Sequence, residues 1–167
     1  VESFRVELTE KYGKHLNTGI FGTRRLFEVL AQNSLNELAY EIINQKDYPS
    51  FGWWLEQGAT TTWERWDGKD SHNHPMFGAV AVYLFRNLLG IEDTSYINGK
   101  ITFTPCLDSV VKEASGSVTT PFGKAKIGFR VNGTTAINIT IPDGLTGELR
   151  YKGTAYKLAP GENKFEF

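Results

Sequence analysis

The sequence has little cysteine, no long apolar run and no excess of charge of one sign. A single cysteine, Cys106, excludes a disulfide within the chain. No run of apolar residues approaches the ~20 that a helix needs to span a bilayer. The net charge of −1 gives no bulk attraction to nucleic acid or to an anionic membrane. We therefore expect neither nucleic acid nor a membrane as a partner.

Histidine is scarce as well, with three in the chain. His72 and His74 have the His-x-His spacing that occurs in metal sites. Zinc sites in proteins are built from at least three protein ligands, usually nitrogen or sulfur. Only His15 remains as a third imidazole, and no cysteine lies near the pair. We predict that the chain binds no metal and needs no cofactor.

Aromatic residues, in contrast, are concentrated in one stretch. They make up 13% of the chain, and all four tryptophans lie between Trp53 and Trp66, among Glu, Arg, Asp and Gly residues. For any single tryptophan, packing in the core is the competing interpretation. Flat aromatic faces beside carboxylates also suit a sugar, because C–H patches stack on the rings while hydroxyl groups form hydrogen bonds. This stretch is the candidate sugar site.

Within the stretch, Glu64 has Trp63 directly before it and Trp66 shortly after it. A carboxylate beside indole rings is partly desolvated, which raises its pKa and makes it a stronger base. Arg65 and Asp67 would then tune this carboxylate or bind the ligand. One interpretation of these residues is therefore that Glu64 is a catalytic carboxylate.

Two features of the stretch also have structural explanations. Thr61-x-x-Glu64 has the spacing of a capping box, in which Glu64 would only accept a backbone N–H at the start of a helix. His74 directly precedes Pro75, a good first residue of a helix. It is interpreted either as a cap or loop residue or as a hydrogen-bond donor to a sugar hydroxyl.

The first half of the sequence has the periodicity of helices and the second half that of strands, with the change near Gly90. Ser34-x-x-Glu37 predicts a capping box for one of the helices. Tyr48-Pro49-Ser50 predicts the end of that helix. Helices are predicted up to Gly13, from Ile20 to Ala31, from Ser34 to the break at Pro49, and from Pro75 to Leu89.

The helix predicted from Pro75 is apolar on almost every side until Arg86. A helix without a polar face is buried on all sides. Four helices in a short chain do not easily surround it. We therefore expect partner helices outside this chain and, without them, an exposed apolar face that associates with itself or with another chain.

After Gly90 the apolar residues alternate with polar ones, as in half-buried strands. Tight turns are predicted at Asn98-Gly99, Asn132-Gly133 and Asp143-Gly144. The fold class is predicted as α+β in two parts, with helices in residues 1–91 and an antiparallel β-sandwich in residues 92–167. A short, packed connector is expected over residues 91–97. Tyr151 and Tyr156 are interpreted as packing or surface residues.

Four segments, in this order and spacing, resemble the C-terminal signatures of bacterial α-L-rhamnosidases of glycoside hydrolase family 78. They are His15–Gly19, Asp47–Gly52, Gly58–Gly68 and Asn73–Val80. The resemblance covers essentially the whole chain, and Gly58–Gly68 is its most specific part. It implies that residues 1–91 are the C-terminal helices of an (α/α)₆ toroid and that the chain is a fragment that lacks the N-terminal part of this toroid. The compartment stays open between the bacterial periplasm and cytoplasm.

The resemblance also implies a reaction. Enzymes of this family invert the anomeric configuration, for which the two catalytic carboxyl groups lie roughly 6.5–9.5 Å apart with a water between them. By motif, Glu64 is the general base, and the general acid belongs to an upstream region that nothing in this chain matches. The isolated chain is therefore expected to be inactive. The predicted sugar pocket consists of Trp54, Trp63, Arg65, Trp66, Asp67 and His74.

The substrate implied is a glycoside or polysaccharide with terminal α-linked L-rhamnose. Two alternatives stay open at this point. The chain could be a non-catalytic carbohydrate-binding or structural module, or part of an inverting toroid hydrolase that acts on another sugar.

Overall fold

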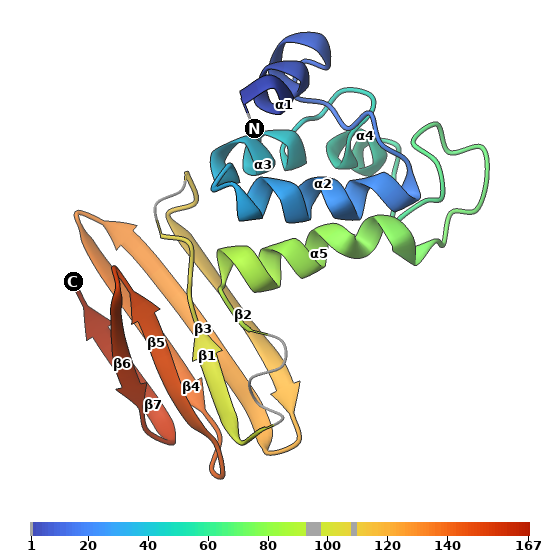
Figure 1. Cartoon of the computed structure of the whole chain (residues 1–167). Helices are drawn as coiled ribbons and strands as arrows, with labels where there is room; N and C mark the ends of the chain where they lie inside the picture. The colour runs from blue at the N-terminus through green and yellow to red at the C-terminus, as the bar shows by residue number, and fades with distance from the viewer. Residues whose placement is uncertain (1, 93–97, 108–109) are drawn as a thin grey trace. The chain divides into compact units, whose positions relative to one another are not determined.

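The computed structural model describes residues 2–92, 98–107 and 110–167. The chain divides into two compact units, Val1–Tyr83 and Leu84–Phe167. The first is helical and the second contains all the described strands (Figure 1). The α+β fold class in two parts is therefore confirmed. The predicted domain boundary between residues 91 and 92 marks the change from helix to strand, and it stays a prediction.

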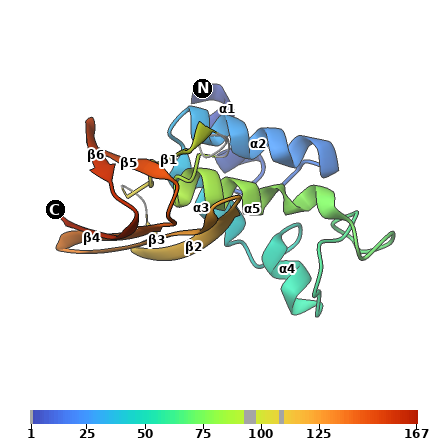
Figure 2. The same ribbon diagram turned by 90° about the horizontal axis from the view of Figure 1, so that it is seen from below.

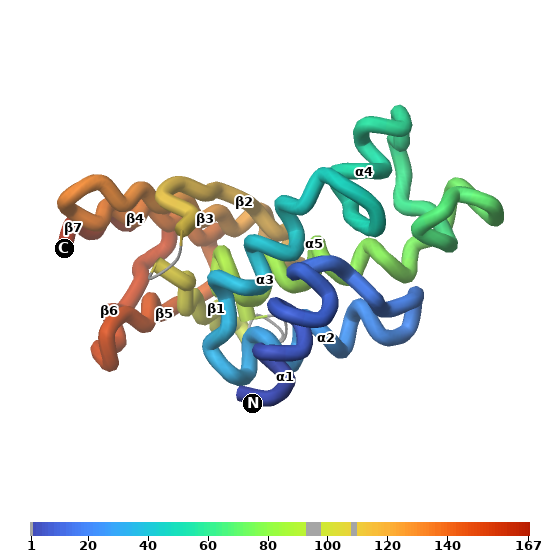
Figure 3. Tube along the Cα trace, turned by 90° about the horizontal axis from the view of Figure 1, so that it is seen from above, coloured from blue at the N-terminus to red at the C-terminus, as the bar shows by residue number. Residues whose placement is uncertain are grey.

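The helical unit contains the predicted helices and one more. α2 lies beside α3 and α5 (Figures 1 and 3), and buried side chains such as Phe27 and Leu30 fill the space around it. The helix that was not predicted, α4, has only six residues, too few for a periodic pattern. The elements are α1 (Glu2–Val6), the π-helical η1 (Glu7–Lys11), α2 (Ile20–Gln32), α3 (Asn36–Ile43), α4 (Phe51–Glu56), the 3-10 helix η2 (Pro75–Gly78) and α5 (Ala79–Tyr83).

The predicted capping box at Ser34 is wrong. Leu35 is the N-cap residue of α3, and no side chain caps that helix. Ser34 has a φ of 58° and closes the preceding helix instead. Its N–H donates to the oxygen of Ala31 (3.1 Å), and the N–H of Leu35 donates to the oxygen of Leu30 (2.8 Å). These two bonds form a Schellman motif at the end of α2, and the left-handed backbone that they require is incompatible with an N-cap.

The helix end predicted at Tyr48-Pro49-Ser50 is wrong, because α3 already ends at Ile43. The segment starts the next helix instead. The Tyr48–Pro49 peptide bond is cis. Ser50 is the N-cap of α4, and its hydroxyl accepts a hydrogen bond from the N–H of Trp53 (2.9 Å). A Cβ on Gly52 would lie 2.3 Å from the backbone oxygen of Gln45, so α4 packs directly against the segment that follows α3.

The helix predicted from Pro75 to Leu89 begins where expected, with Pro75 in its first turn and His74 as N-cap. It is not uniform, because the 3-10 turn η2 and the α-helix α5 are followed by the π-helical η3 (Leu84–Leu88). Gly90 follows it with a φ of 67°, as predicted for the residue after a helix. The division between the two units falls between Tyr83 and Leu84, so η2 and α5 belong to the first unit and η3 to the second.

The second unit is a β-sandwich of two sheets, with strand orders β1-β5-β6 and β2-β3-β4-β7. Figure 2 shows them as two layers. Side chains that alternate along β3 and β4, from Ala125 to Ile141, are buried between the layers together with Phe103 and Leu149. The strands are β1 (Lys100–Phe103), β2 (Glu113–Thr120), β3 (Gly123–Asn132), β4 (Thr134–Ile141), β5 (Thr146–Tyr151), β6 (Thr154–Leu158) and β7 (Gly161–Glu166).

The sandwich was predicted to be antiparallel, and one pair differs. β1 pairs with β5 in parallel, which the long chain segment between these two strands permits. The turns at Asn132-Gly133 and Asp143-Gly144 are confirmed between β3 and β4 and between β4 and β5. Residues 93–97 lie outside the described residues, and with them most of the predicted connector and one arm of the hairpin expected at Asn98-Gly99.

The helical unit exposes several large apolar side chains. Phe21 on α2 is 76% exposed, Leu55 on α4 71% and Val82 on α5 46%. An exposed apolar face was expected if partner helices lie outside this chain; self-association through it stays a prediction. Of the helices in residues 2–92, 98–107 and 110–167, none is both long and apolar enough to cross a bilayer.

Candidate functional site

The loop of residues 57–74 joins α4 to η2 and carries most of the predicted site residues. Its two arms pair with each other through the backbone. The N–H of Glu64 donates to the oxygen of Ser71, and the N–H of His74 donates to the oxygen of Thr62, both over 2.8 Å. The hydroxyl of Thr62 returns a hydrogen bond to the oxygen of His74. The loop is therefore an ordered, folded-back segment that fixes the backbone of Glu64.

The capping-box interpretation of Thr61-x-x-Glu64 is wrong. No helix begins in this part of the described chain, since α4 ends at Glu56 and η2 starts at Pro75. The hydroxyl of Thr61 donates to the backbone oxygen of His72 across the loop. Glu64 thus has no helix to cap.

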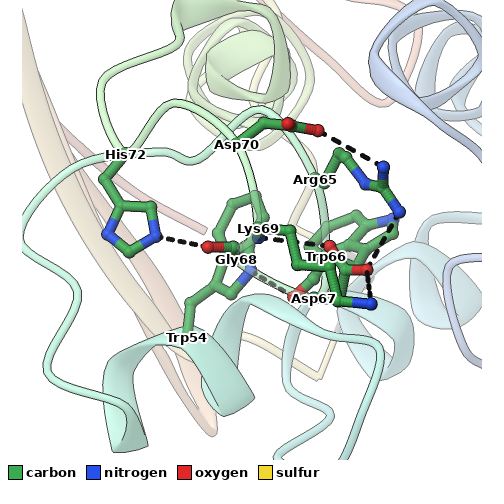
Figure 4. A network of polar contacts seen from close by, with 8 residues as sticks. All are labelled: Trp54, Arg65, Trp66, Asp67, Gly68, Lys69, Asp70 and His72. Atoms are coloured by element: carbon green, nitrogen blue, oxygen red, sulfur yellow. Dashed lines mark hydrogen bonds and ion pairs between the residues drawn. The ribbon is translucent and has the colours of Figure 1, made fainter.

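Trp54, Trp63 and Phe77 form the buried centre of this region. Trp54 is 2% exposed and Trp63 6%, with their ring centroids 5.6 Å apart. The indole N–H of Trp54 donates to the backbone oxygen of Trp66 over 3.0 Å (Figure 4). Rings so deeply covered offer no face to a sugar in this structure. Their burial favours core packing over the predicted role in sugar binding.

Gly68 and His72 close the loop over Trp63. The His72 ring stacks face to face on Trp63, with centroids 4.1 Å apart and an interplanar angle of 11°. Its Nε2 lies 2.7 Å from the oxygen of Gly68 (Figure 4). Gly68 has a φ of 69°, and a Cβ there would lie 2.8 Å from Cζ3 of Trp63. This contact was not predicted, because the sequence does not tell which ring the loop folds onto.

Arg65 is held between two carboxylates (Figure 4). Its guanidinium lies 2.9 Å from Oδ2 of Asp67 and 3.3 Å from Oδ2 of Asp70. Burial raises the pKa of Asp67, but the N–H of Lys69 and the charge of Arg65 outweigh it and hold the pKa below its usual value. The charge of Asp67 in turn raises the pKa of Arg65. The pair therefore stays ionised near neutral pH. Asp70 was not among the predicted residues.

The side chain of Glu64 takes no part in the ion pairs of Arg65. Its side chain forms no hydrogen bond or ion pair with any described residue, although Arg65 is its direct neighbour in the sequence. The side chain is partly buried. A carboxylate in this position can accept a hydrogen bond from water or from a ligand.

A pocket of about 190 Å³ brings four of the predicted residues together. Trp66 forms part of its wall, and its indole N–H is fixed by a 2.9 Å hydrogen bond to the oxygen of Thr18. Trp54, Trp63 and His74 do not line it. The lining residues are Gly19, Tyr48, Glu64, Arg65, Trp66, Asp67 and Phe77.

Gly19 and Tyr48 were not predicted as site residues. Each belongs to a segment that had been singled out as a motif, His15–Gly19 and Asp47–Gly52. Phe77, from the Asn73–Val80 segment, also lines the pocket, so all four segments meet there. The shared resemblance of the four segments was the signal that could have found these residues.

The same two segments are joined by an ion pair. Nε2 of His15 lies 2.9 Å from Oδ1 of Asp47. Burial lowers the pKa of His15, but Asp47 and the backbone oxygens of Tyr12 and Gly13 outweigh it and raise the pKa above its ordinary value. The hydrogen bond from His15 lowers the pKa of Asp47. The pair holds the ends of the two segments together.

His74 is partly buried at the start of η2. Its Nδ1 is buried and has no hydrogen-bond partner among the described residues. The predicted role of His74 in the sugar pocket stays a prediction. Within the described chain, no group of three or more His, Cys, Asp or Glu side chains is arranged to hold a metal ion.

Two family models match the chain. The model described as the bacterial alpha-L-rhamnosidase 6 hairpin glycosidase domain matches residues 1–88, and that of the bacterial alpha-L-rhamnosidase C-terminal domain matches residues 90–166. The helical unit is thus of the six-hairpin glycosidase class. The chain belongs to the bacterial α-L-rhamnosidase family.

Individual relatives agree with this assignment. An alpha-L-rhamnosidase of Alteromonas sp. (strain LOR) is 29% identical over 155 residues, which are 86% of this chain and 17% of that protein. One from Formosa agariphila is 29% identical over 163 residues, 89% of this chain and 18% of that protein. Among solved structures, the alpha-L-rhamnosidase from Dictyoglumus thermophilum superposes on this chain with a TM-score of 0.85 and 30% sequence identity. The match covers 99% of this chain and 22% of that chain. This chain thus spans about a fifth of the length of its relatives.

Proposed function

We propose that this chain supplies the general base and part of the sugar pocket of an inverting glycoside hydrolase that removes terminal α-linked L-rhamnose. The observation that carries the proposal is the Glu64 carboxylate. It lines the pocket without a counter-ion, because the neighbouring Arg65 forms ion pairs with Asp67 and Asp70 instead. A carboxylate neutralised by an arginine would be a weaker base, so this separation of charges favours the catalytic role.

In the proposed reaction, Glu64 accepts a proton from a water molecule as the water oxygen attacks the anomeric carbon. The glycosidic C–O bond breaks on the opposite face of the sugar, and the leaving oxygen receives a proton from the general acid. The water must fit between the two carboxyl groups, which explains their wide separation in inverting enzymes. Among the pocket residues, Trp66 offers an aromatic surface and the ionised Asp67 a hydrogen-bond acceptor for a sugar hydroxyl.

The general acid is proposed to come from a part of the toroid that lies outside this chain. Relatives about five times as long have room for it, since this chain spans 17–18% of the two sequence relatives. We assign residues 1–91 to the toroid and residues 92–167 to the C-terminal sandwich. The exposed apolar side chains of the helical unit, Phe21 and Leu55 among them, would face the remaining helices or, in their absence, another copy.

Replacing Glu64 by Gln in the complete enzyme tests the proposal. The amide keeps the size of the side chain but cannot accept the proton, so we expect kcat to fall by about 10²–10⁴-fold while rhamnose still binds. Glu56→Gln, an exposed glutamate at the end of α4, is the matched control and should leave kcat unchanged.

Hydrolysis of an aryl rhamnoside, followed by NMR of the first sugar released, gives both the rate and the stereochemistry. Inversion with a large loss in Glu64→Gln supports the proposal. Turnover within a few-fold of the wild type in Glu64→Gln, or retention of configuration, contradicts it.

A further inference from the structure

Tyr48 is an exposed aromatic residue in the wall of the candidate pocket. Its side chain is 53% exposed, although it lines the same pocket as Glu64 and Trp66. A large exposed apolar surface inside a pocket is an expected feature of a ligand-binding residue.

The backbone on both sides of Tyr48 is fixed. The preceding residue, Asp47, is bound to His15 by the 2.9 Å ion pair. Ser50, two residues later, caps α4 through its hydrogen bond to the N–H of Trp53. The backbone at Tyr48 is therefore held in place before any ligand arrives, which lowers the entropic cost of binding.

The ring itself is supported from the core. It packs edge-on against Trp53, with centroids 5.2 Å apart and an interplanar angle of 82°. Trp53 in turn packs edge-on against the buried Trp63, at 6.2 Å and 88°. A chain of aromatic contacts thus joins the exposed tyrosine to the buried cluster.

We propose that Tyr48 is a substrate-binding residue whose ring stacks on the apolar C–H face of the rhamnosyl residue. The inference rests on the proposed function and extends it. A general base of an inverting enzyme lies on the side of the sugar opposite the leaving group. Tyr48 shares its pocket with Glu64, so it contacts the sugar that is released and not the aglycone.

The test uses Tyr48→Ala and Tyr48→Phe in the complete enzyme. Stacking on the sugar stabilises the bound substrate and the transition state alike, so its loss raises KM and leaves kcat nearly unchanged. We expect KM to rise about tenfold in Tyr48→Ala, the order of one good aromatic contact, and by the same factor for rhamnosides with different aglycones. Tyr48→Phe keeps the ring and should stay close to the wild type.

Phe122→Ala is the matched control, because Phe122, between β2 and β3, is also an exposed aromatic residue, at 44%, and does not line the pocket. It should leave KM unchanged. Tyr48→Leu covers the case in which Tyr48→Ala does not fold, since leucine keeps apolar volume without an aromatic face and should also raise KM.

The binding of free L-rhamnose by calorimetry separates this inference from the proposed function, because it needs no turnover. If Tyr48→Ala binds rhamnose more weakly while Glu64→Gln stays active, the stacking role of Tyr48 is supported. The proposed role of Glu64 as general base is then contradicted. An unchanged rhamnose affinity and KM in both Tyr48→Ala and Tyr48→Leu overturns the inference, and so does a rise in KM that depends on the aglycone.

Discussion

Gly68 is the residue on which the closure of the loop of residues 57–74 depends. It combines a φ of 69° with a contact that leaves no room for a side chain, since a Cβ would lie 2.8 Å from the Trp63 ring. Gly58, at the start of the same loop, also has a positive φ, 80°, but nothing lies within 4 Å of its Cβ position. Both glycines therefore need a left-handed backbone, but only Gly68 is also packed against a neighbouring side chain.

Replacing Gly68 by Ala is predicted to destabilise the chain more than replacing Gly58 by Ala. A left-handed backbone costs a residue with a Cβ roughly 1–2 kcal/mol, and both variants carry this cost. Gly68→Ala must in addition displace Trp63 or His72 from their stacked positions. Urea unfolding followed by tryptophan fluorescence measures both free energies. Equal losses in the two variants would show that the contact with Trp63 contributes nothing.

The residues of the pocket were predictable only in part. Glu64, Arg65, Trp66 and Asp67 are close in the sequence, and the structure places all four in one pocket. The pairing of Arg65 could not be read from its position, because a guanidinium beside a glutamate can turn to any carboxylate within reach. The burial of the tryptophans before Glu64 depends on how the loop folds back, which is a tertiary effect.

At the scale of elements, the His15–Asp47 ion pair joins the segment before α2 to the segment before α4. Because the pKa of His15 is raised on folding, its contribution to stability is full below pH 6.5, the ordinary value, and is lost as the pH rises through the raised pKa. Because the pKa of Asp47 is lowered, its contribution is full above pH 3.8 and is lost as the pH falls through the lowered pKa. The pair therefore stabilises the fold most between these two values.

Asp47→Asn is predicted to lower the free energy of unfolding more at pH 5 than at pH 8.5. The uncharged amide cannot stabilise the protonated ring of His15. At pH 8.5 this ring is already neutral, so the substitution removes less stabilisation there. Glu41→Gln is the control, since Glu41 pairs with Lys14 over 2.8 Å and no histidine takes part. Its cost should be similar at both pH values. Chemical denaturation at the two pH values measures the differences, and an equal cost of Asp47→Asn at both contradicts the prediction.

Elements with a clear apolar period were found from the sequence, and those without one were not. α2 and the helix after Pro75 follow a helical period or a strong start signal, and β3 and β4 alternate regularly. β2 is rich in Ser and Thr and has little alternation, and α4 is a single short helix. The parallel pairing of β1 with β5 joins strands far apart in the sequence, which no local pattern reports.

At the scale of the whole molecule, the almost entirely apolar helix was the best indicator of missing partners. The described helical unit has exposed apolar side chains on three of its helices, Phe21, Leu55 and Val82. Relatives several times as long have the chain length to supply the covering helices. We expect these side chains to face further helices of the toroid in a longer chain, and those helices to complete the pocket.

The 167-residue chain alone is predicted to release no rhamnose from an aryl rhamnoside. The general acid is proposed to lie outside this chain, and general acid catalysis contributes on the order of 10²–10⁴-fold. The missing part of the pocket would lower the rate further, because the substrate would not be held in line with the water. Circular dichroism shows whether the purified chain is folded, and a complete relative provides the positive control for the assay. Release of rhamnose that disappears in Glu64→Gln would show that this chain holds both catalytic groups, and the proposal of an upstream acid would then be wrong.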